Sequence, residues 1–129
     1  TQQVVPGEDE PYDVLFAQPG ELLRAGVEFA ISTDAYYLSV TLPYEAGSAV
    51  PFGLPRDEAL KAITLYPARI LGLGDRLGTI EEGKIANLIL TDGDPLEIRT
   101  QVERVFIGGR EVPTGNRRTR LYEQHRRRP

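Results

Sequence analysis

The first side chain that could do chemistry is a carboxylate at the end of an apolar stretch. Asp34 follows residues 27–33 (VEFAIST), whose β-branched and apolar centre predicts a β-strand. In parallel α/β sheets and barrels, side chains at the carboxyl ends of strands project toward the ligand-binding loops. A carboxylate there can bind a divalent cation or accept a proton from water. Asp34 can equally be an ordinary turn or capping aspartate, and its own residue type and position favour that simpler interpretation.

Other candidate ligands are few. The sequence has one histidine and no cysteine, and His125 lies in an arginine-rich tail, where we expect an exposed helix residue. Asp92 and Asp94 stand in an Asp-Gly-Asp-Pro run, which is typical of a turn and not of a calcium site. A hydrolytic metal site needs several nitrogen or oxygen ligands to hold the ion and activate its water. We therefore expect no metal in this chain by itself, and no activity from it in isolation.

Three tyrosines follow Asp34 at short distances along the chain. Tyr36, Tyr37 and Tyr44 could contact a substrate, because a tyrosine combines an apolar ring with a hydrogen-bonding hydroxyl. The alternative is that the rings fill a core or the underside of a loop. Both interpretations stay open at this point.

Length and composition indicate one globular domain. The chain has 129 residues, of which 40% are hydrophobic, and no apolar run is long enough for a transmembrane helix. Residues 1–11 do not resemble a secretory signal, and Thr1 in place of Met suggests a piece of a longer polypeptide. The absence of cysteine is compatible with a cytoplasmic location.

Charge is distributed unevenly. The formal net charge is -4, but residues 116–129 hold six arginines against Glu123, which makes them +5 and leaves -9 for residues 1–115. This tail lacks lysine, and its aromatic content is limited to Tyr122, so we expect a solvated terminal helix and no nucleic-acid or membrane partner.

Helices are expected in the first half of the chain. A short helix over 20–26 ends at Gly26, which can adopt the left-handed conformation. Residues 35–53 read as a long, partly helical loop in which Pro43 opens a short helix. Proline in the first turn, acids beside it and one apolar face predict a helix over 54–63, followed by a shorter one over 67–72.

Short strands are expected in the second half. Apolar and β-branched residues predict strands at 77–80, 86–90 and 102–107, with turns at 81–84 and 92–95. Gly108 and Gly109 favour a tight hairpin into residues 110–112. A further short strand is possible at residues 3–5.

The order of several short motifs resembles the amidohydrolase superfamily, and within it the imidazolonepropionase-like branch. They are Ala-Gly-Val at 25–27, Ile-Ser-Thr-Asp at 31–34, Gly-Leu-Pro-Arg-Asp-Glu-Ala-Leu at 53–60, the run from Ala62 to Leu73, the run from Leu77 to Leu90, and Asp-Gly-Asp-Pro-Leu at 92–96. The resemblance extends from Ala25 to Val112, and residues 119–123 of the tail also fit that branch. Asn87 departs from it, standing where the family usually has aspartate, and we expect it to change a turn or sandwich contact. Ala35, Tyr36 and Tyr37 also replace the more polar residues common after the aspartate.

The resemblance implies an α/β fold: a C-terminal fragment of a (β/α)8 barrel plus strands of the small β-sandwich that accompanies it. Residues 1–76 would be the last barrel strands and helices, 77–113 the sandwich strands and hairpin, and 114–129 the basic tail. Asp34 would match the family aspartate that binds a catalytic metal and takes a proton from the attacking water.

The implied activity is metal-dependent hydrolysis of non-peptide C-N bonds, cyclic amides in particular. The divalent metal, expected to be zinc, would be held only in the intact parent protein, whose other ligands would lie upstream of Thr1. Expected partners are a small-molecule substrate, the remainder of the barrel and further copies in a homo-oligomer. The alternative is a non-catalytic structural or association module derived from an amidohydrolase, because unpaired strand edges favour association.

Overall fold

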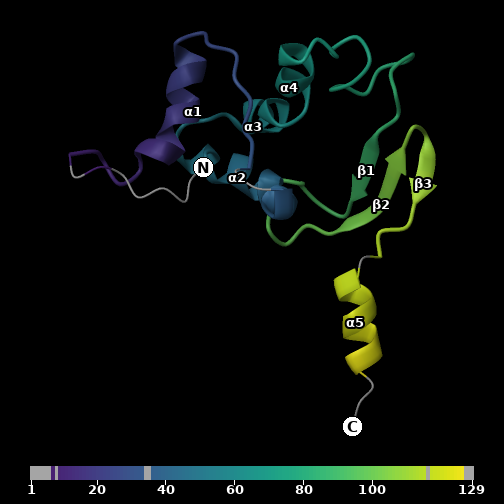
Figure 1. Ribbon diagram of the computed structural model, residues 1–129. Helices are drawn as coiled ribbons and strands as arrows, with labels where there is room; N and C mark the ends of the chain where they lie inside the picture. Colours follow the sequence, from purple (N-terminus) through teal and green to yellow (C-terminus); the bar gives the residue numbers. More distant parts are fainter. Residues whose placement is uncertain (1–6, 8, 34–35, 116, 127–129) are drawn as a thin grey trace.

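The computed structural model describes residues 7, 9–33, 36–115 and 117–126 and contains a helical part followed by a small sheet (Figure 1). The helical part comprises α1 (Val14–Arg24), η1 (Tyr36–Thr41), α2 (Leu42–Ser48), η2 (Val50–Phe52), α3 (Arg56–Ala62) and α4 (Leu65–Ile70). The sheet comprises β1 (Leu88–Thr91), β2 (Val102–Ile107) and β3 (Arg110–Val112), and α5 (Arg117–Arg126) follows it. The strand expected at residues 3–5 lies outside the described residues.

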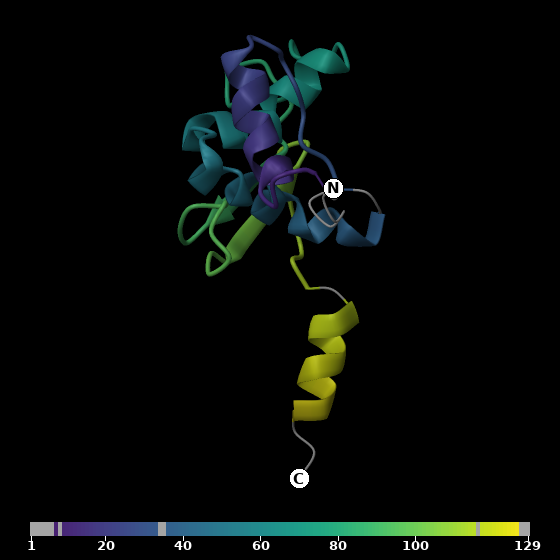
Figure 2. The ribbon, with the colours of Figure 1, turned by 90° about the vertical axis from the view of Figure 1, so that its left-hand side faces the viewer.

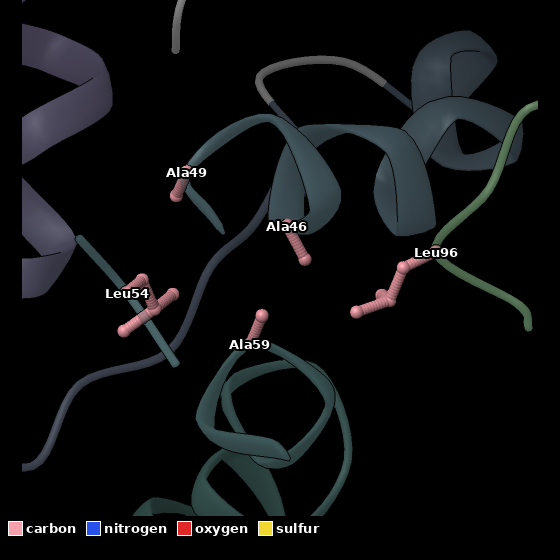
Figure 3. Packing of buried hydrophobic residues seen from close by; sticks show 5 residues of the cluster. All are labelled: Ala46, Ala49, Leu54, Ala59 and Leu96. Carbon is pink, nitrogen blue, oxygen red and sulfur yellow. The ribbon is translucent and has the colours of Figure 1, made fainter. Parts of the chain in front are cut away.

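Small side chains build the core. Ala46 of α2 and Ala59 of α3 are fully buried and point into a common space, which Leu96 enters from the loop after β1 (Figure 3). Ala49 and Leu54 complete this cluster of buried residues. Because alanine has only one side-chain carbon, α2 and α3 can approach each other closely, and Leu96 supplies the volume that fills the space between them.

Gly47 makes the close contact with the loop possible. A Cβ atom added to Gly47 would lie 2.6 Å from the carbonyl oxygen of Leu96, well inside van der Waals contact. The missing side chain therefore allows the loop after β1 to lie directly on α2.

Helix α1 begins earlier than the sequence predicts, at Val14 in place of residue 20, and carries Pro19 in its interior. Proline removes one helical hydrogen bond, and tertiary packing offsets this cost. Phe16 stacks on Phe52 with ring centroids 5.1 Å apart, and Gly20 is buried against the backbone of Gly53. The predicted end is confirmed: Gly26 has φ +71°, and the Gly26 and Val27 amides bond to the carbonyls of Leu23 and Leu22.

The strand predicted at residues 27–33 is absent from this chain, where the segment has no regular secondary structure. Its Ile31 amide donates to the Ala62 carbonyl at 3.0 Å, and Phe29 and Ile31 pack against the core. A strand needs a neighbouring strand to share a hydrogen-bond ladder, and the described residues place a helix end there instead.

The predicted strand at residues 77–80 is also wrong. These residues form bends, and Gly78 has φ +96° because it passes directly over α4, where an added Cβ would lie 2.8 Å from that of Ala68. The turn at 81–84 is confirmed by a bond from the Lys84 amide to the Glu81 carbonyl at 3.2 Å.

The sheet is antiparallel with the order β1-β2-β3. The predicted hairpin is confirmed, since Gly108 and Gly109 have φ +57° and +78° between β2 and β3. Cross-strand pairing places Ile89, Val105 and Val112 on one face of the sheet. Ile89 is 53% exposed, so this face is left partly uncovered by the described residues.

The predicted helices over the middle of the chain are largely confirmed by α2, α3 and α4, with Gly72 at φ +69° after α4. The tail forms α5 as expected, and α5 extends away from the rest of the molecule in both views (Figures 1 and 2). Over the described part of the chain, no helix has the length and apolar character that crossing a bilayer requires.

The close contact at Gly47 leads to a stability prediction. Gly47→Ala should lower the free energy of unfolding by roughly 1–3 kcal/mol, because the new methyl group displaces the Leu96 loop. Urea unfolding followed by circular dichroism measures the change. The matched control is Gly7→Ala, whose new Cβ would meet nothing nearer than 3.7 Å and should change little. Equal stability of the two variants would contradict the proposed contact.

Candidate functional site

The segment that leads to the candidate aspartate is held against the helices. Asp34 itself lies outside the described residues, together with Ala35. The extended segment before it is fixed by the Ile31–Ala62 backbone bond, and η1 follows it directly at Tyr36. The structure therefore describes both flanks of the candidate residue, whereas its role as a metal ligand stays a prediction.

The three candidate tyrosines belong to two consecutive elements. Tyr36 and Tyr37 open η1, and the placement of their side chains lies outside the described part of the structure. Tyr44 stands in the first turn of α2 and is partly exposed. The predicted helix start at Pro43 is confirmed, since α2 begins at Leu42.

A cavity of about 220 Å³ lies beside the segment before Asp34. Its walls come from α1, from the extended segment and from α2, through Leu15, Gln18, Pro19, Leu22, Phe29, Ala30, Ile31, Ser32 and Glu45. The polar side chains in this lining are Gln18, Ser32 and Glu45. Sequence reasoning did not single out Gln18 or Glu45, because the cavity exists only where helices separated along the chain meet.

An ion-pair cluster joins α3 to the loop after β1. Arg56 Nε donates to Asp94 Oδ2, and Arg56 Nη2 donates to Glu97 Oε1 at 3.1 Å. The Arg56 guanidinium and the Leu96 amide, which donates to Asp94 Oδ1 at 2.8 Å, together hold the pKa of the Asp94 carboxyl below its usual range. These ion pairs hold the loop after β1 against α3, and Leu96 of this loop packs into the core.

The turn interpretation of Asp92 and Asp94 is confirmed. Asp92 Oδ1 accepts from the Gln101 amide at 2.7 Å, and Asp94 caps the Leu96 amide. Both carboxylates are thus used in closing and anchoring one loop. The sequence alone did not predict that Asp94 pairs with Arg56, which lies 38 residues earlier in the chain.

A second carboxylate stabilises the contact between α3 and α4. Lys61 Nζ donates to Glu58 Oε1 at 2.8 Å, and the Tyr66 hydroxyl donates to Glu58 Oε2. The hydrogen bond from Lys61, and next that from Tyr66, lower the pKa of Glu58. The packing of α3 against α4 therefore depends partly on the ionised Glu58 carboxylate.

Asn87 occupies a structural position at the hairpin. Its Oδ1 accepts from the Gly108 amide at 2.9 Å, beside a bond from the Gly109 amide to the Ala86 carbonyl. Asn87 thus makes a turn contact, and a change of this contact relative to aspartate stays a prediction. Asparagine satisfies the turn amide with its side-chain carbonyl, so the position needs no negative charge.

Metal-binding side chains do not converge in the described residues, since no three His, Asp or Glu side chains there form a group able to hold an ion. His125 lies exposed in α5, as the sequence predicts. The described residues thus do not by themselves provide a complete set of metal ligands.

Comparison with known proteins identifies the family. Residues 16–112 match the model of the amidohydrolase family, and the chain belongs to this family. This match ends at the last residue of β3, so α5 lies beyond it.

Similar proteins agree with this membership. An imidazolonepropionase from Maricaulis maris is 40% identical over 98 residues, covering 71% of this chain and 24% of its own length. An N-substituted formamide deformylase from Arthrobacter pascens is 31% identical over 121 residues, covering 80% and 22% respectively. The crystal structure of an amidohydrolase from Thermotoga maritima MSB8 superposes with a TM-score of 0.71 at 38% identity, covering 75% of this chain and 26% of that one.

The chain thus spans about a quarter of the length of these relatives. The expected α/β amidohydrolase fragment is confirmed at this level by the family match and the structural neighbours.

The lowered pKa of Asp94 predicts a specific pH dependence. A carboxylate whose pKa is depressed by folding stabilises the fold above its unfolded pKa, near 3.8, and this contribution is lost as the pH falls through the folded value. Asp94→Asn should therefore destabilise the protein at pH 7 and flatten the fall in stability below pH 4, measured by urea unfolding across that range. The exposed Asp75→Asn is the control, and an unchanged pH slope in Asp94→Asn would contradict the role of the Arg56 pair.

Proposed function

We propose that this chain is the C-terminal part of a metal-dependent amidohydrolase that hydrolyses non-peptide C-N bonds, cyclic amides in particular. The family match carries the proposal, and the relatives' names support the bond type, since they include an imidazolonepropionase and an N-substituted formamide deformylase. The coverage of about a quarter of each relative supports a partial protein.

In the proposed parent protein, residues 27–33 are the last strand of a (β/α)8 barrel and β1–β3 belong to a β-sandwich. Two observations support this. The segment 27–33 is extended and has no strand beside it in the described residues. The sheet exposes apolar side chains such as Ile89 and Ile107, and a three-stranded sheet gains stability when such a face packs on another layer.

Asp34 is the proposed catalytic residue and metal ligand. Its carboxylate accepts a proton from the attacking water, the water oxygen bonds to the amide carbon, the C-N bond breaks, and the protonated Asp34 returns this proton to the freed nitrogen. Tyr44, together with Tyr36 and Tyr37, is proposed to contact the substrate, since it lies partly exposed on the element that follows the candidate segment.

Asp34 would be the ligand that this chain contributes to a divalent metal, proposed to be zinc, which would supply Lewis-acid activation of the water and of the amide carbonyl. The described residues hold no set of ligands for it, so the proposal requires further ligands from residues outside this chain. A cytoplasmic location, a small-molecule substrate and a homo-oligomeric assembly complete the proposal.

The test compares this chain with the longest natural polypeptide that contains it. In that polypeptide, Asp34→Asn should reduce hydrolysis of cyclic amides by about 10²- to 10⁴-fold, because the amide side chain cannot accept the proton. Formation of the ring-opened product, which is heavier than the cyclic amide by one water and is followed by mass spectrometry, reports activity, and elemental analysis reports bound metal.

The matched control for that experiment is Asp75→Asn, an exposed carboxylate whose loss should leave activity unchanged. Full activity of Asp34→Asn would contradict its role. Tight zinc binding and turnover by the 129-residue chain in isolation would contradict the partial-enzyme proposal. If the longer polypeptide also lacks both metal and turnover, the structural or association module is the better explanation.

A further inference from the structure

The C-terminal helix is charged oppositely to the rest of the chain. Residues 116–129, here called the basic arm, carry +5, whereas residues 1–115 carry -9. Helix α5 extends away from the body in two views at right angles (Figures 1 and 2), and its residues 120–126 are all exposed. The family match ends at residue 112, so the arm is outside the part shared with the family model.

The arm also exposes apolar groups. Leu121 is 41% exposed and Tyr122 is 62% exposed. An exposed ion pair within the arm, Arg126 to Glu123 at 3.5 Å, contributes little to its stability. Arginine combined with tyrosine is typical of protein-binding surfaces, because both side chains offer large contact areas together with polar groups.

A complementary surface lies at the other end of the chain. Residues 9–13, here called the acidic turn, contain Asp9, Glu10 and Asp13 and precede α1. Tyr12 in the middle of this turn is 81% exposed. None of these three carboxylates forms an ion pair with a described residue. The turn thus presents uncompensated negative charge around an exposed ring.

Contact between the two surfaces within one copy is disfavoured by the architecture. Figure 1 shows the acidic turn beside the start of α1 at one end of the molecule and α5 below the sheet at the other. Four residues, 113–116, separate β3 from α5, and such a link spans at most about 14 Å. A second copy can present its acidic turn without this restriction.

We propose that the basic arm docks on the acidic turn of a second copy of this chain. In a twofold dimer each arm meets the partner's turn, so one kind of contact is made twice and the assembly closes. A nucleic-acid partner is less well matched, because the charge of -9 on residues 1–115 would repel a polyanion.

Charge exchange tests the proposal. Sedimentation equilibrium at low salt should show the wild-type dimer, and 0.5 M NaCl should weaken it by screening. Arg120→Glu combined with Arg126→Glu should raise the dimer dissociation constant at least about tenfold, as should Asp9→Lys combined with Glu10→Lys. An equimolar mixture of these two variants should associate more tightly than either variant alone, because the heterodimer keeps one native contact, between the unchanged arm (+5) of one copy and the unchanged acidic turn (-3) of the other.

Two controls make the outcomes decisive. Arg99→Glu combined with Arg110→Glu changes the net charge equally at exposed positions outside the arm and should leave association near the wild-type value. Recovery in the mixture also demonstrates that both variants are folded. A wild-type chain that stays monomeric at protein concentrations up to about 1 mM would overturn the proposal, because association weaker than this would not count as a dimer. Failure of the mixture of variants to associate more tightly than either variant alone would overturn it too. Tighter binding of the arm to duplex DNA than to a second copy, measured by fluorescence anisotropy, overturns it as well.

Discussion

The insertion of Leu96 between α2 and α3 is the contact on which the arrangement of this chain depends. Leu96 comes from the loop after β1, yet it fills the space lined by Ala46 and Ala59. Gly47 lets the loop backbone touch α2, and Arg56 holds the loop from α3 through Asp94. Since α2 follows the candidate segment and supplies one wall of the cavity, the loop after β1 influences the geometry of a site to which it contributes no side chain.

Several apolar side chains of this chain are left uncovered by the described residues. The sheet leaves Ile89 and Ile107 exposed, and residues 27–33 run beside helices without a strand ladder. Metal-binding side chains do not gather in the described part of the chain either. These three observations, with the short coverage of the relatives, agree with the proposed function, in which one further part of a longer protein would complete the proposed barrel, sandwich and ligand set.

Opposite charges are separated along the chain with little compensation between them. The carboxylates inside the body are used in local pairs, such as Glu58 with Lys61 and Glu111 with Arg104. The arm contains an exposed local pair, Arg126 with Glu123, and no carboxylate of the acidic turn forms an ion pair with a described residue. Both surfaces combine charge with an exposed tyrosine. Charge that does not stabilise the fold is available for association, which is why the proposed contact is placed there and not on the apolar sheet face.

Local backbone chemistry could be predicted from the sequence. Gly26 ends α1, Gly108 and Gly109 form the hairpin, and the proline before α3 marks its start, because each depends on conformations of neighbouring residues. The position of Asp34 after a predicted strand favours an ordinary turn aspartate, and only the order of motifs across the chain favours a metal ligand. Tertiary structure decided the rest. The segments 27–33 and 77–80 have strand-like composition but no partner strand here, and the Arg56–Asp94 pair joins residues 38 positions apart. Strand pairing, ion pairs and cavities require groups from distant positions in the sequence, and a local sequence pattern does not predict which of these groups come into contact.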